Sequence, residues 1–165
     1  MLSTANVLLG CMLVVYLIVI YLVYCNYNNS NTVSCIVTKN RTIFGLMILM
    51  GILTLLYEYH RNCKYSFTII TGILIGIYGL LLYDTHTKVH YAFAGLTFVG
   101  ILLFMTLHAK NKFLMTLLFL EFVFLILCLA KKALFCVETL FILNFAVFYL
   151  SLHYLTFRWN YFLNN

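Results

Sequence analysis

The chain has few side chains that could do chemistry, and only one of them lies deep inside a long apolar segment. Glu121 sits near the middle of the segment from Phe113 to Ala130. An ionisable group at membrane depth is expensive, so it marks a functional candidate. We expect its carboxyl to be protonated, or bonded to a hydroxyl or amide of a neighbouring helix. A proton relay, a ligand anchor and a helix-packing hydrogen bond are the three interpretations left open.

A second polar group lies between two apolar segments. His86 and His90 are four residues apart and would share a helix face, with Asp84 just before them. Imidazole and carboxylate together could bind a metal ion. Glu138 is the only further acid expected near that membrane surface, and the chain has no H-E-x-x-H or C-x-x-C pattern. We therefore favour polar residues at the membrane interface, and predict no bound metal or cofactor.

The last apolar segment has the most polar side chains. Glu138 opens it, where an acid complements the positive end of the helix dipole. Asn144 lies six residues further on and needs a partner inside the bundle. His60, His108 and His153 fall at helix ends, where interfacial histidines are more usual than the paired ligands of a haem.

The composition identifies the kind of protein. Charged residues make up only 8% of the 165, and hydrophobic residues make up 65%. A soluble domain carries about 25% charged residues. A soluble enzyme, a nucleic-acid-binding protein and a disordered chain are therefore excluded. The chain is predicted to be an integral membrane protein whose partners are membrane lipids, other membrane proteins or further copies of itself.

Six apolar segments are long enough to span a bilayer as helices, which takes about 20 residues each. Their apolar runs are continuous rather than alternating, which favours helices over barrel strands. Short connections make neighbouring helices antiparallel. The sequence predicts an all-α, six-helix membrane bundle that forms a single domain over residues 1–165, with helices at about 6–24, 43–59, 66–83, 89–107, 113–130 and 137–157.

Glycines recur along the third segment. Gly72, Gly76 and Gly79 form a stripe of small residues that allows another helix to approach closely. We favour packing inside the bundle over a dimer interface.

The topology rests on weak signals in the first loop, Cys25–Thr42. Lysine and arginine are evenly divided between the two membrane sides, so they do not decide the orientation. The sequons at Asn28 and Asn40 favour a lumenal loop and cytosolic termini. Cys25 and Cys35 bracket the same loop and could form a disulfide there, with two free thiols as the alternative.

The segment from Ile73 to Ala94 resembles the damage-regulated autophagy modulator family, which includes the GPI-anchor lipid-remodelling regulator of the Golgi. The shared features are a glycine-bearing third helix, a short polar loop, and His90 followed four residues later by Ala94. The segment from Glu138 to Asn144 resembles the acid and asparagine of that family's final helix. The resemblance covers about half the chain.

This resemblance implies a non-enzymatic modulator of lipid handling, autophagy or membrane-protein trafficking in an endomembrane or the plasma membrane. It also implies that His90, Glu138 and Asn144 form a polar cluster near the lumenal leaflet. Two alternatives remain. One is a small respiratory-type subunit with Glu121 on a proton path, and the other is a metal-dependent lipid hydrolase using Asp84, His86 and His90.

Overall fold

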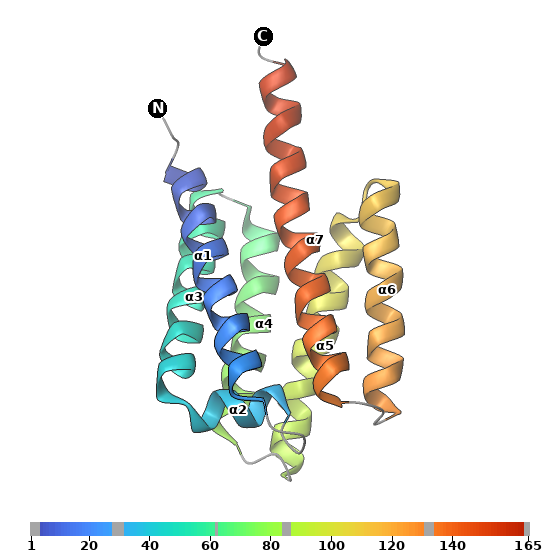
Figure 1. Ribbon diagram of the computed structural model, residues 1–165. Helices are drawn as coiled ribbons and strands as arrows, with labels where there is room; N and C mark the ends of the chain where they lie inside the picture. The colour runs from blue at the N-terminus through green and yellow to red at the C-terminus, as the bar shows by residue number, and fades with distance from the viewer. Residues whose placement is uncertain (1–3, 28–31, 62, 84–86, 131–133, 164–165) are drawn as a thin grey trace. The chain divides into compact units, whose positions relative to one another are not determined.

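The computed structural model describes the chain except residues 1–3, 28–31, 62, 84–86, 131–133 and 164–165. Throughout the described residues every regular element is a helix (Figure 1). The helices are α1 (Thr4–Cys25), α2 (Val33–Lys39), α3 (Arg41–His60), α4 (Lys64–Leu82), α5 (Lys88–His108), α6 (Lys112–Leu129) and α7 (Leu134–Leu163).

The predicted all-α fold is confirmed, and each of the six predicted segments lies on one long helix. Within the part of the chain that the structure describes, five stretches are long and apolar enough to cross a membrane, namely α1, α3, α4, α5 and the Phe135–Tyr154 part of α7. The length and apolar composition of these helices are compatible with an integral membrane protein. The shorter α6 has 18 residues, and its role as a sixth span stays a prediction. The largest difference in boundaries is at α7, which continues past the expected end at Phe157.

The short helix α2 was not predicted, because the whole stretch Cys25–Thr42 was taken as a loop. Its start has a local cause: the Thr32 hydroxyl oxygen accepts a hydrogen bond from the Cys35 backbone N–H at 3.3 Å. Within α2, Ile36 and Val37 are almost fully buried. The first loop is therefore partly helical and is anchored by two apolar side chains.

Asn40 separates α2 from α3 and fixes the ends of both. Its backbone N–H donates to the carbonyl of Ile36 at 3.2 Å, which closes α2. Its Oδ1 accepts from the backbone N–H groups of Thr42 and Ile43 at 3.1 and 3.3 Å, which caps the start of α3. This candidate glycosylation residue thus has a structural role at the helix boundary.

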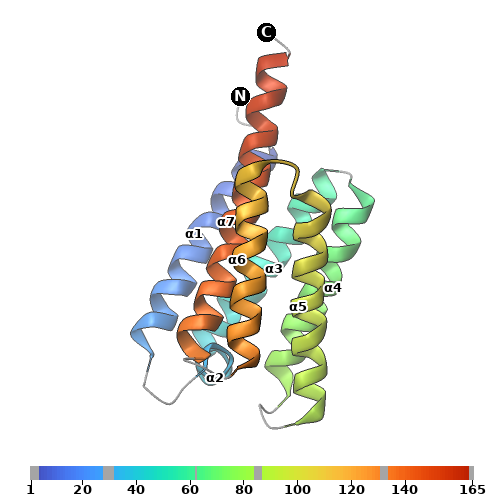
Figure 2. The ribbon, with the colours of Figure 1, turned by 90° about the vertical axis from the view of Figure 1, so that its right-hand side faces the viewer.

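The chain divides into two compact units, residues 1–100 and 101–165, and the boundary falls within α5. In the first unit α1 packs along α3, and α2 packs on α3 and α4 (Figure 1). In the second unit α6 and α7 lie side by side in both views (Figure 2). The single membrane domain over residues 1–165 stays a prediction.

Close helix contacts in the first unit depend on small residues. The Tyr78 hydroxyl donates to the carbonyl of Met47 at 3.1 Å, and its ring passes directly over Gly51. A Cβ atom added at Gly76 would meet the side chain and backbone of Thr97, whereas one added at Gly72 would meet no atom of another element within 4 Å. The glycine stripe on α4 is therefore used at Gly76 to bring α5 close, as packing inside the unit requires.

The second unit has an aromatic core. Phe104 is fully buried, and its ring lies 5.8 Å from that of Tyr149 and 5.9 Å from that of Phe145. Phe148, also fully buried, lies edge-on to it at 6.5 Å. Aromatic pairs in these geometries stabilise beyond their buried area.

We expect Gly76→Ala to lower stability and Gly72→Ala to leave it unchanged or raise it. Alanine is the better helix former by about 1 kcal/mol at either site. At Gly76 the new methyl group would meet the Thr97 backbone, and overpacking of this kind costs about 1–3 kcal/mol. Thermal unfolding of the detergent-solubilised protein, followed by circular dichroism, would compare the two variants. Equal midpoints would contradict the packing role of Gly76.

Candidate functional site

The deepest polar contact in the second unit joins α6 to α7. Glu121 and Asn144 are both buried, with Glu121 at 0% exposure. The Asn144 amide donates to Glu121 Oε2 at 2.5 Å and to the backbone carbonyl of Leu117 at 2.8 Å. The expected amide partner of Glu121 on a neighbouring helix is thus Asn144.

The helical repeat explains why the two side chains meet. On α6 the buried residues follow a three-and-four spacing that ends at Glu121, namely Leu114, Leu117, Leu118 and Glu121. On α7 a similar stripe contains Asn144, namely Val137, Phe141, Asn144 and Phe148. Each polar residue therefore occupies a place in an apolar stripe, and packing of the two stripes brings them together.

One oxygen of the Glu121 carboxyl group lacks a hydrogen-bond partner. Among the described residues, Glu121 Oε1 has no hydrogen-bond partner although it is buried. A buried polar atom without a partner is unfavourable and calls for an explanation in structure or function. Oε1 is the atom of this pair able to accept a further hydrogen bond or a proton.

His90 forms the second site, at the start of α5 in the first unit. Its ring is only 8% exposed. Nδ1 lies 3.0 Å from the carbonyl oxygen of Leu80 and 3.1 Å from that of Tyr83. These carbonyls belong to the C-terminal end of α4, where backbone acceptors lack partners within the helix. His90 therefore holds the end of α4 from the neighbouring helix.

A cavity of about 420 Å³ opens beside His90, where α2, α4 and α5 meet. Its lining combines an imidazole, hydroxyl groups and leucine side chains: Ser34, Thr38, Leu80, Leu81, Leu82, Tyr83, Thr87 and His90. Several of these hydroxyls are engaged locally. Thr38 donates to the carbonyl of Cys35 at 3.1 Å, and Thr87 accepts from the His90 backbone N–H at 3.2 Å.

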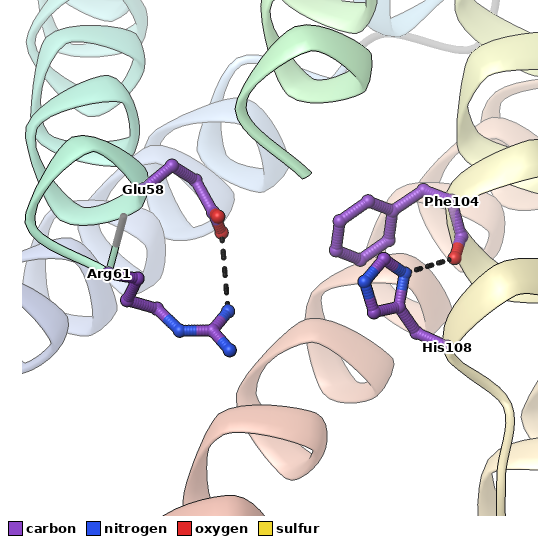
Figure 3. A network of polar contacts seen from close by, with 4 residues as sticks. All are labelled: Glu58, Arg61, Phe104 and His108. Atoms are coloured by element: carbon purple, nitrogen blue, oxygen red, sulfur yellow. Dashed lines mark hydrogen bonds and ion pairs between the residues drawn. The ribbon is translucent and has the colours of Figure 1, made fainter. Parts of the chain in front are cut away.

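Glu58, near the end of α3, is a buried acid that the sequence did not identify. It is 0% exposed, and its Oε1 lies 3.8 Å from a guanidinium nitrogen of Arg61 (Figure 3). Arg61 also lies over the Tyr57 ring at 5.9 Å. Glu58 lies in the last turn of α3, at the end of a helix suited to span a membrane. No sequence signal distinguishes an acid there that faces inward from one that faces water.

His60 and His108 are the last residues of α3 and α5, as expected, whereas His153 lies inside α7, which continues to Leu163. His108 Nδ1 donates to the carbonyl of Phe104 at 2.8 Å, and its ring stacks on that side chain at 4.4 Å (Figure 3). His153 is buried against Tyr149, with ring centroids 4.3 Å apart, and His60 is exposed.

The expected cluster of His90, Glu138 and Asn144 spans both units and stays a prediction. His90 and Asn144 each have the partners given above within their own unit. Glu138 is not in the first turn of its helix, which corrects one expectation. Because α7 begins at Leu134, Glu138 lies beyond the first turn, where the dipole acts less strongly.

Two other expectations concern residues outside the described part of the chain. Asn28, Asp84 and His86 are not described. Within the described residues, no three His, Cys, Asp or Glu side chains lie close enough to hold a metal ion. The metal site of Asp84, His86 and His90 is therefore neither assembled nor tested by the structure.

In the structure Cys25 and Cys35 are not joined by a disulfide. Cys35 lies in the first turn of α2, which Thr32 caps, and Cys25 is exposed at the end of α1. The disulfide was predicted on the assumption that the first loop, Cys25–Thr42, contains no helix.

Comparison of the chain with protein-family models, with curated proteins and with solved structures finds no match. The functional proposal therefore depends on the residues and geometry described above.

We expect Asn144→Leu to lower the free energy of unfolding by about 1–3 kcal/mol, because it leaves the buried Glu121 carboxyl without a donor. The double variant Glu121→Leu with Asn144→Leu should recover much of that loss, since removing both polar partners can be nearly neutral. Denaturant unfolding of all the variants, with Glu121→Leu alone completing the cycle, measures the coupling. Additive losses would show that the contact contributes nothing of its own.

Proposed function

We propose that the protein is a six-span integral membrane protein that binds membrane lipid and modulates lipid handling, autophagy or membrane-protein trafficking without catalysis. The observation that supports this best is the cavity beside His90. It combines polar groups with leucine side chains at the end of a helix suited to span a membrane. A lipid needs that combination, because its headgroup is polar and its chains are not.

The way buried polar groups are used supports a non-catalytic role. His90 bonds to the backbone carbonyls of Leu80 and Tyr83, and Asn144 bonds to Glu121. These contacts tie one helix to another. A nucleophile would instead need a base within hydrogen-bond reach and a third group to orient that base.

The family resemblance forms part of the same proposal. It would make the chain a divergent member of the damage-regulated autophagy modulator family, with cytosolic termini and an endomembrane or plasma-membrane location. His90, one of the residues that carry the resemblance, lines the cavity. The resemblance and the geometry thus indicate the same end of the bundle.

A second candidate function is a small subunit of a membrane complex with Glu121 on a proton path. The observation that favours it is the buried Oε1 atom, which has no partner among the described residues. Ionisable groups inside membranes often serve proton relays. Glu121→Gln would abolish proton transfer by such a complex, but should leave a lipid-binding protein functional.

The proposed function predicts lipid binding without turnover. The full-length protein, purified in mild detergent, should retain lipid that mass spectrometry detects. After reconstitution into vesicles of defined lipids, it should generate no new lipid species over time. A product that accumulates with wild-type protein but not with His90→Ala would overturn the non-catalytic proposal.

Glycosidase treatment tests the topology and the secretory location together. We expect a mobility shift that Asn28→Gln removes. Asn40→Gln should leave the shift in place, because Asn40 caps α3 directly at the helix boundary. The absence of any shift in the wild-type protein from eukaryotic cells would remove the support for a lumenal first loop.

A further inference from the structure

The tautomer of His90 is fixed by its partners. Nδ1 lies within hydrogen-bond distance of two oxygens, those of Leu80 and Tyr83, and both are backbone carbonyls. A carbonyl oxygen can only accept, so Nδ1 must carry the hydrogen. In the neutral ring Nε2 then has a lone pair and no hydrogen. The ring therefore presents an acceptor, not a donor, at its second nitrogen.

This acceptor belongs to a residue that lines the cavity. His90 is one of the lining residues, and no described residue makes a hydrogen bond to its Nε2. The neighbouring hydroxyls of Thr38 and Thr87 have the local contacts given above. A ligand that matches Nε2 must bring its own hydrogen, as a hydroxyl group does and as a fully ionised phosphate does not.

The surroundings of the cavity point to a lipid as the source of the hydroxyl. Leu82 is 72% exposed, Val89 44% and Tyr91 60%, and all three lie on the helix ends that form the cavity. These apolar side chains lie on spanning helices, where an acyl chain could pack against them. A water-soluble polyol would make no use of such a surface.

We propose that the cavity binds the free hydroxyl group of a neutral membrane lipid, with His90 Nε2 accepting its hydrogen bond. This inference rests on the proposed function and names the ligand class of that site. The leucine lining contacts the glycerol or chain atoms next to the hydroxyl, and Nδ1 keeps the ring in place through α4.

The test uses two lipids that differ only in the hydroxyl, 1,2-diacylglycerol and its 3-O-methyl ether. Binding to the full-length protein in detergent is measured by native mass spectrometry. We expect wild-type protein to prefer the diacylglycerol about 3- to 10-fold, which corresponds to one net hydrogen bond. Equal binding of the two lipids would overturn the inference while leaving the proposed function in place.

The matched variant is His90→Asn. The asparagine amide can place a donor near the position of Nδ1 and so hold the end of α4, but it has nothing at the position of Nε2. We expect His90→Asn to lose the preference for the lipid with a free hydroxyl and to keep the wild-type melting temperature. His90→Ala should lose the preference and also melt at a lower temperature. A preference that persists in His90→Asn at wild-type strength would exclude Nε2 as the acceptor.

Two further measurements place the ligand and identify its source. Thr38→Leu, which fills the cavity, should reduce diacylglycerol binding. Thr68→Leu is its control, since Thr68 is an exposed threonine on α4 with a similar local hydrogen bond and does not line the cavity. An equal loss of diacylglycerol binding in the two variants would contradict the location of the site.

Free glycerol should not compete with diacylglycerol for the site. Competition at low millimolar concentration would show that the site's ligand is a soluble polyol and not a lipid. Retention of neither lipid by wild-type protein would overturn the proposed function as well.

Discussion

The constraint that shapes this structure is that a polar group surrounded by hydrocarbon must find its partner within the protein. Threonine meets it inside a single helix, because its hydroxyl reaches the carbonyl four residues earlier. It does so on several helices, at Thr54, Thr71, Thr97, Thr106 and Thr139. Glu121, Asn144 and Tyr78 instead bond to another helix. These few side chains therefore give specific tertiary contacts to helices that are mostly apolar.

Much of the fold could be predicted from the sequence, because hydrophobic length alone defines a spanning helix. That is why the six segments were located, including the one predicted at about 89–107, which lies on α5. The helix α2 could not be predicted in the same way, since its seven residues are too few for a periodic signal. Its stability depends on burial of Ile36 and Val37 against other helices. Such burial is a tertiary property that a local pattern does not contain.

The candidate site was predictable only in part, for a related reason. An isolated Asn144 or Glu121 in an apolar run must have a partner, and the sequence shows this need without showing which residue meets it. For Glu58 even the need was hidden, because the end of a span is close to water and an acid there requires no explanation. The burial of Glu58 depends on which face of α3 it occupies. Sequence reasoning therefore finds deep polar residues more readily than buried ones near the interface.

The donors of Asn144 limit what Glu121 can do. An asparagine amide has two N–H groups, and here one serves the carbonyl of Leu117 while the other serves Glu121 Oε2. Asn144 thus has no donor left for Oε1. Any further hydrogen on the carboxyl must be its own proton or come from a group outside this pair. If the pair only joins α6 to α7, a neutral carboxyl with its proton on Oε1 is sufficient. If Glu121 lies on a proton path, Oε1 is the oxygen that can take up and release the proton, because Oε2 already accepts from Asn144.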